Sequence, residues 1–229
     1  GEELGRRLAA VLEVVYLIFN EGHAATRGQD WMRTALCDEA LRLARMLARL
    51  APREAEAHGL QALLELQASR LRARVDAEGR PILLMDQDRS RWDRLLIGRG
   101  LAALEKARGL GKEPGPYELQ AAIAACHARA TSAEATDWVQ IVALYDALAE
   151  RLPSPVVALN RAVAVGMAYG AQAALPLVDA LQSDAAMQRY HLLHAVRGDL
   201  LTKLGRRTEA RAAFEQAAAM TANAREREV

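Results

Sequence analysis

Apolar residues recur at intervals of three and four along almost the whole chain. The first series consists of Leu4, Leu8, Val11, Leu12 and Val15. Residues at this spacing share one face of an α-helix, so the series predicts an amphipathic helix that ends near Gly22. No segment shows the sustained alternation of apolar and polar residues that marks a half-buried strand. The pattern therefore predicts an all-α fold.

Nine further helices are expected. After a polar turn at Thr26–Asp30 they run over about Trp31–Leu50, from Pro52 into the arginine-rich stretch Arg70–Arg74, and over Gln87–Arg108, Tyr117–Arg129, Asp137–Arg151, Pro155–Ala168, Ala171–Gln182, Tyr190–Leu204 and Arg207–Thr221. Pro52 is placed at a helix start because a proline there loses no helical hydrogen bond. Two irregular segments interrupt the series: Val75–Leu84, which ends in either a short strand or a docked loop, and Gly109–Pro116, with three glycines and two prolines.

The last forty residues contain a pattern that resembles one tetratricopeptide repeat. The small residues of the repeat are Gly198, Ala210 and Ala217, its turn residue is Gly205, and its aromatic residue is Phe214. His194 and Leu201 replace the usual Trp and Tyr. Small residues let two antiparallel helices approach closely, and Phe214 is expected to fill the space beside the pair. The spacing of residues in the second helix of this repeat recurs from Ala40 and from Ile141. The sequence therefore predicts a tetratricopeptide-like helical repeat array with a degenerate middle.

The chain length of 229 residues suits one large or two small globular units. We expect a single tetratricopeptide-like domain over 1–229, or two subregions, 1–109 and 116–229, joined by the Gly/Pro linker.

Composition narrows the classes of function. The formal net charge is +1, so no overall field attracts nucleic acid or an anionic membrane. The longest apolar run, Val14–Phe19, is far too short to span a bilayer, and the first residues lack a signal peptide. The sequence thus predicts a cytoplasmic protein or fragment. Cys37 and Cys126 stand apart without metal-ligand spacing, which predicts buried thiols.

The most unusual local string holds three acids and two arginines within eight residues. Its candidate partner-binding members are Asp86, Gln87, Asp88, Arg89, Arg91, Trp92 and Asp93. One interpretation places the acids at a helix N-terminus, where they cap free N–H groups, with Trp92 as a core anchor. The other interpretation is an ion-pair network with the preceding loop, or a partner-facing surface rich in Arg and Trp.

Two further segments supply candidate partner-binding residues. Asn20 and Glu21 close the first helix beside Gly22, either as ordinary helix-end residues or as the lining of a groove with the acidic–arginine string. Tyr117 and Gln120 begin an alanine-rich helix whose simplest role is helix contact.

No arrangement of residues indicates catalysis. His191 and His194 are three apart on a helix, but no Glu-x-x-His or Cys pair accompanies them, so core or interface positions are favoured over zinc. The sequence also lacks a nucleophile elbow, an HExxH motif and a dinucleotide fingerprint. We expect neither enzymatic activity nor a cofactor.

Four strings, in this order, carry a resemblance to a known family. They are Tyr16–Gly22 (YLIFNEG), Asp86–Asp93 (DQDRSRWD), Tyr117–Ile123 (YELQAAI) and Pro155–Arg161 (PVVALNR). Together they resemble the C-terminal tetratricopeptide-like extension of a group of bacterial extracytoplasmic-function (ECF) sigma factors. The resemblance implies a regulatory interaction domain whose partners are the sigma regions of the same full-length protein, core RNA polymerase, or both.

The chain departs from such full-length factors because it contains neither of the two DNA-binding sigma regions. It has no basic recognition helix, so we expect no direct DNA binding by this fragment and no membrane association. Two alternatives stay open: a free-standing repeat scaffold that binds a peptide or protein, and an enzyme or small-molecule sensor that uses the acidic–arginine string.

Overall fold

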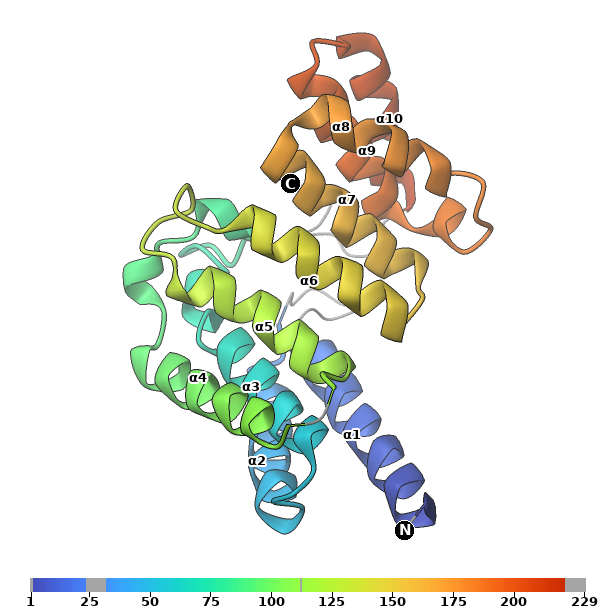
Figure 1. The fold of residues 1–229 in the computed structure, drawn as a ribbon. Coiled ribbons are helices and arrows are strands. Elements are labelled where there is room, and N and C mark those ends of the chain that lie inside the picture. The colour runs from blue at the N-terminus through green and yellow to red at the C-terminus, as the bar shows by residue number, and fades with distance from the viewer. Residues whose placement is uncertain (1, 24–31, 112, 221–229) are drawn as a thin grey trace. The chain divides into compact units, whose positions relative to one another are not determined.

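The computed structural model describes residues 2–23, 32–111 and 113–220 (Figure 1). The described residues form ten α-helices: α1 (Glu2–His23), α2 (Thr34–Leu50), α3 (Ala55–Ala68), α4 (Arg94–Gly109), α5 (Pro116–Arg129), α6 (Trp138–Arg151), α7 (Pro155–Tyr169), α8 (Ala171–Leu181), α9 (His191–Lys203) and α10 (Arg207–Met220). Four short 3-10 helices join them: η1 (Leu71–Ala73), η2 (Leu84–Asp86), η3 (Arg89–Arg91) and η4 (Met187–Arg189). The predicted all-α class is confirmed.

Two compact units make up the chain, one ending at Thr136 and the other beginning at Asp137. The sequence had suggested a division at Gly109–Pro116, but α5 packs against α3 and α4 and belongs to the first unit. Glu56 of α3 fixes the start of α5, which follows the Gly/Pro segment. The carboxylate of Glu56 accepts the backbone N–H groups of Tyr117 and Glu118, both at 3.0 Å. Glu56 therefore caps the first turn of α5, whose N–H groups have no partner within the helix.

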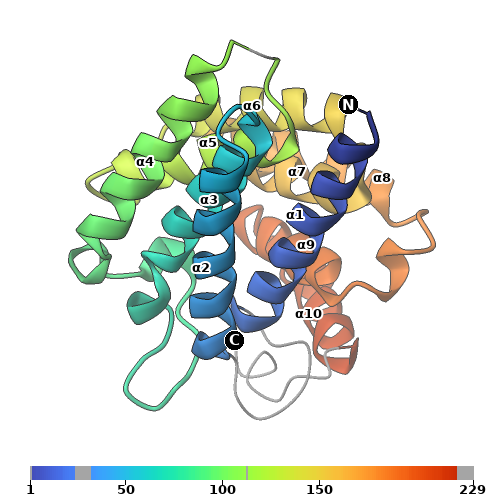
Figure 2. The ribbon, with the colours of Figure 1, turned by 90° about the horizontal axis from the view of Figure 1, so that it is seen from below.

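The first unit is built around α3, which contacts α1, α2, α4 and α5 (Figure 2). Most of its residues are buried, including Leu60, Leu64 and Leu66. The close approach of α5 depends on Gly59, because a Cβ atom there would lie 2.7 Å from the backbone nitrogen of Glu118. An alanine-rich α5, as the sequence indicated, permits this short distance between helices.

The second unit contains α6 to α10, and each helix packs on the next along the chain. These successive contacts fit the predicted helical repeat array. In the last pair, Gly205 makes the turn with a φ of 75°, and Ala210 is buried. Phe214 differs from the expectation. Its ring lies against Gly198, but the residue is 43% exposed, so it covers the edge of the α9–α10 pair and does not wedge into the core.

Several helix boundaries also differ from those predicted. The helix α4 begins at Arg94, not near residue 87, because Asp93 occupies the N-cap and the residues before it form separate 3-10 turns. Pro52 lies in the turn that precedes α3, which starts at Ala55. The predicted turn at 26–30, Trp31 and Thr221 lie outside the described residues.

Candidate partner-binding site

The acidic–arginine string is a compact connection between η2 and α4. Asp93 caps α4 by accepting the N–H groups of Leu95 (2.9 Å) and Leu96 (3.0 Å). Its own N–H donates to the carbonyl oxygen of Ser69 at 2.8 Å, which joins the start of α4 to the end of α3. Asp88 caps η3 through the N–H of Ser90 (2.9 Å). The cap of the long helix is therefore Asp93, and not Asp86 or Asp88 as the sequence had predicted; Asp88 caps only the short helix η3.

The two arginines of the string that the sequence treated alike have different environments. Arg89 is 8% exposed and donates from Nη1 to the carbonyl oxygens of His127 (2.6 Å) and Ala130 (2.9 Å). Its Nη2 donates to Thr136 Oγ1 at 3.1 Å. Arg91, two residues later, is exposed. The string therefore combines a structural arginine with a surface arginine.

Trp92 is the buried anchor that the sequence predicted, with 3% of its surface exposed. Two guanidinium groups lie over its ring: that of Arg89 at 4.9 Å from the ring centroid and that of Arg70 at 6.0 Å. Such cation–π contacts favour the charged form of an arginine that lies away from bulk water. Trp92 thus connects the string to the arginine-rich end of α3.

The arginines near Trp92 lie close enough to repel one another. The pKa of Arg70 is lowered to about 10, chiefly by burial and then by the charge of Arg89. The pKa of Arg74 is lowered to about 9 by burial and then by Arg70. All three groups stay charged at neutral pH, so the region has a high positive potential. The sequence noted Arg70–Arg74 only as a helix end; its nearness to the string was not predicted.

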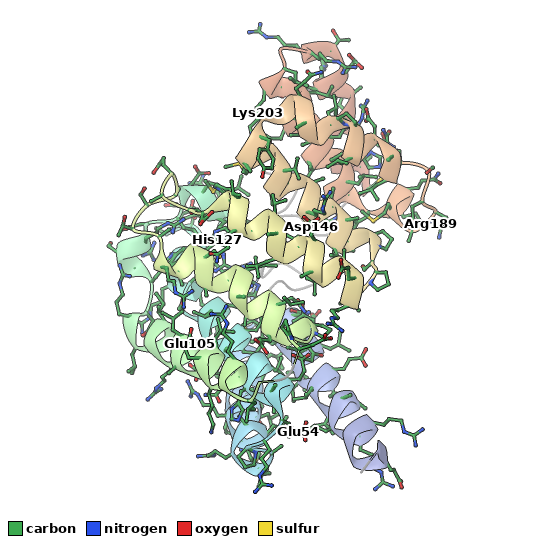
Figure 3. All side chains as sticks on the ribbon, in the orientation of Figure 1. Glu54, Glu105, His127, Asp146, Arg189 and Lys203 are labelled. Carbon is green, nitrogen blue, oxygen red and sulfur yellow. The ribbon has the colours of Figure 1, made fainter. Side chains whose placement is uncertain are left out.

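Two histidines beside these arginines are held neutral. Arg74 donates from Nη1 to His23 Nε2 (2.5 Å) and from Nη2 to the carbonyl oxygen of His23 (3.0 Å). An arginine N–H can only donate, so Nε2 accepts and Nδ1 bears the proton. His127, labelled in Figure 3, lies in the last turn of α5. Its pKa is lowered to about 4 by burial, then by Arg70 and Arg89.

An open pocket of about 530 Å³ lies at the surface beside this cluster. Its lining residues are Arg72, Ser90, Arg91, Trp92 and Asp93. Arg72 and Arg91 are exposed, whereas Trp92 is buried and contributes only a small part of the wall. A surface with this composition suits recognition, because Arg and Trp are enriched among the residues that dominate binding energy in protein interfaces.

The remaining predicted residues lie elsewhere in the first unit. Gln87 is buried and donates to the carbonyl oxygen of Ile82 (3.1 Å), while Asp86 is exposed at the end of η2. Glu21 pairs with Arg33 at 3.1 Å, and Asn20 is exposed on α1.

Tyr117 and Gln120 lie at the start of α5 and contact α1. Gln120 Oε1 accepts a hydrogen bond from the Tyr16 hydroxyl at 3.1 Å, and the rings of Tyr16 and Tyr117 are 5.5 Å apart. His127, which Arg89 contacts, is ten residues further along α5, about 15 Å at the helical rise. Tyr117 and Gln120 therefore form a contact separate from the pocket.

Exposed apolar residues also follow one face of α1. Val11, Val14 and Leu17 are spaced by three residues and are exposed. Consecutive exposed apolar side chains on a helix are a common feature of surfaces that bind another protein.

Neither a metal centre nor a membrane span is found in the parts of the chain that the structure describes. Across residues 2–23, 32–111 and 113–220, no three His, Cys, Asp or Glu side chains are placed to hold a metal ion. His194 is buried in α9, which agrees with the core position that the sequence analysis favoured as one of two interpretations. Cys37 and Cys126 are both buried, and neither is in a disulfide. None of the described helices is long and apolar enough to cross a bilayer.

Comparison with known proteins finds a family and a relative whose functions are not described. A family model described as "Family of unknown function (DUF6596)" matches residues 7–108. An uncharacterized protein of Rhizobium meliloti (strain 1021) is 52% identical over 220 residues. That match covers 96% of this chain and 51% of the relative, so the chain spans about half the length of the curated relative it matches. The pocket residues 72 and 90–93 fall within the family match.

Proposed function

We propose that this chain is a regulatory protein-interaction domain of an ECF-type RNA polymerase sigma factor, which modulates sigma activity in transcription initiation. Its direct partners are the sigma regions of the same protein, core RNA polymerase, or both. Four strings in order along the chain support the assignment of class, and the helical repeat array supports a binding role.

The pocket beside Trp92 is the observation that carries the proposed interaction. The exposed arginines Arg72 and Arg91 supply groups that a partner can contact, and the buried Trp92 is a fixed part of the pocket wall. The apolar face of α1 offers a second contact in the same unit.

A free-standing repeat scaffold is the second candidate, because a helical array binds peptides in many proteins without any link to transcription. The two candidates differ in what the native gene encodes before the codon for Gly1. The sigma-factor proposal requires two DNA-binding regions there, one for each promoter element. A gene that encodes an unrelated domain at that position would overturn the proposal and leave the scaffold as the better account.

A further inference from the structure

Four arginines surround Trp92 without forming an ion pair. Arg70 and Arg89 lie over the indole ring, and Arg72 and Arg91 line the adjacent pocket. Within the described residues, none of the four guanidinium groups comes within ion-pair distance of a carboxylate. Other arginines of the same unit are neutralised locally, as Arg45 is by the buried Glu65 at 2.7 Å. The cluster therefore concentrates positive charge that the described structure leaves unpaired.

The carboxylates nearest to the cluster are engaged by backbone groups. Asp93 accepts two N–H groups at the start of α4, and Asp88 accepts the N–H of Ser90. Glu134 attracts Arg89 without forming an ion pair with it. These acids reduce the positive potential in part, and Asp88 and Asp93 each accept the chain's own N–H groups through Oδ1. A group with free oxygen atoms would still find unpaired donors on Arg72 and Arg91.

Buried polar atoms at the same place also lack partners. The indole Nε1 of Trp92 and the Nε of Arg89 are buried and have no acceptor among the residues that the structure describes. A buried donor without an acceptor costs free energy, so sites of this kind often bind an anion or ordered water. Burial lowers the pKa of both Arg70 and Arg89, and the charge of Arg89 lowers the pKa of Arg70 further.

We propose that the pocket lined by Arg72, Ser90, Arg91, Trp92 and Asp93 binds an oxyanion, either a carboxylate or a phosphate group. Arg72 and Arg91 supply the direct contacts, since a planar guanidinium matches the oxygen pair of either group. Arg70 and Arg89 add positive potential from their positions on the indole ring. The proposal rests on the function proposed above only for the source of the anion, which would be an acidic side chain of the partner or a free phosphate.

The test is titration calorimetry on the purified chain with two probes, inorganic phosphate and an acetylated penta-glutamate peptide, each against sodium chloride at the same ionic strength. The Arg72→Gln/Arg91→Gln variant removes the two pocket charges. Arg53→Gln/Arg99→Gln is the matched control, because both residues are exposed arginines of the same unit, and among the described residues neither lies within ion-pair distance of a carboxylate. Both variants have the same net charge, so a difference between them reports the site.

We expect saturable binding of at least one probe to the wild type and the control, and binding at least about tenfold weaker to the pocket variant. The stronger probe identifies the source of the anion. Equal binding by the two variants, or no saturable binding of either probe to a wild-type chain with its native helical circular dichroism, would overturn the proposal. The calorimetry contains no transcription protein, so its result is separate from the proposed function. If the chain bound an anion but bound neither the sigma regions nor core RNA polymerase, the proposed function would be refuted and the anion site would stand.

Discussion

Arg89 donates a hydrogen bond of 2.6 Å from Nη1 to the carbonyl oxygen of His127. The last carbonyl groups of a helix have no partner within the helix, and here a side chain from a distant segment supplies one for α5. The same guanidinium reaches Ala130 and Thr136 beyond the helix end. The connection before α4 is thus fixed to the end of α5, which gives Arg89 a structural role that its neighbour Arg91 does not share.

Replacing these two arginines separately should distinguish the two roles. Arg89→Ala leaves the carbonyl groups near the end of α5 without their charged donor, and we expect a loss of about 2–3 kcal/mol in the free energy of unfolding, reduced somewhat because repulsion with Arg70 is relieved. Arg91→Ala removes an exposed side chain and should change stability by less than about 0.5 kcal/mol. Urea denaturation followed by circular dichroism measures both. Equal losses in the two variants would contradict this separation.

His127 should make the protein less stable in mild acid. Its pKa is about 4 in the folded chain and 6.5 without the folded environment, because burial and the nearby arginines oppose its charge. Below pH 6.5 the unfolded chain takes up a proton that the folded chain does not, so stability falls as the pH falls from 6.5 to about 4 and is unaffected above 6.5. The loss can reach about 3 kcal/mol.

The variant His127→Gln isolates this contribution, because glutamine does not titrate. Between pH 7 and pH 5, the melting temperature of the wild type should fall more than that of His127→Gln. His23, whose pKa is also lowered by burial and by Arg74, adds a change of the same sign that is common to both proteins. Parallel pH profiles for the two proteins would show that His127 is not held neutral.

Replacement by alanine should have opposite effects on stability at two glycines of the first unit. At Gly59 a Cβ atom would lie 2.7 Å from a backbone nitrogen of α5, which cannot move aside without separating the helices. We expect Gly59→Ala to cost about 1–3 kcal/mol. Gly98 lies in α4 with no atom within 4 Å of such a Cβ, so Gly98→Ala should stabilise the helix by about 0.5–1 kcal/mol. Thermal melts compare them, and a stabilising Gly59→Ala would refute the close α3–α5 packing.

Because Phe214 contacts Gly198, substitutions at these two positions should have non-additive effects on the free energy of unfolding. Because Phe214 is half-exposed, Phe214→Ala should cost about 1–2 kcal/mol, less than the loss for a fully buried ring. The three nearest atoms to a Cβ on Gly198 all belong to that ring. Gly198→Ala should therefore be more favourable, by about 1 kcal/mol, in the Phe214→Ala background than in the wild type. Additive effects would contradict the contact.

Hydrogen exchange shows which helices are destabilised by Phe214→Ala. Faster exchange in Phe214→Ala is expected in α9 and α10, with α3 protected as before, because these helices belong to different compact units. Loss of protection in α3 would indicate one cooperative unit.

The sequence predicted the helices well where periodicity was long, as in α2, α6 and α9, and it identified Trp92 as buried. It placed Asp86–Asp93 on a helix because the acids there look like a cap, but only Asp93 caps α4, and the preceding residues follow their own short turns. It also missed that Arg70 and Arg72 approach the string. That contact joins residues about twenty positions apart through the packing of α3 on α4, which local patterns do not encode.

The sequence also treated Gly109–Pro116 as a domain linker, because glycine and proline weaken helices. The structure connects this segment to α3 through the Glu56 carboxylate, and a Cβ atom at Gly115 would come within 2.3 Å of that group. A contact across sixty residues of chain thus places the boundary of the first unit after α5.

Affinity for the sigma regions tests the central claim most directly. Those regions, produced separately from the native gene, and core RNA polymerase are immobilised, and binding of the chain is measured by biolayer interferometry for the wild type, Arg72→Ala/Arg91→Ala and the control Arg53→Ala/Arg99→Ala. We predict that the wild type and the control bind at least one of the two surfaces equally well, and that the pocket variant binds at least about tenfold more weakly with an unchanged melting temperature. The absence of binding to both surfaces, or equal binding by all three proteins, would contradict the account.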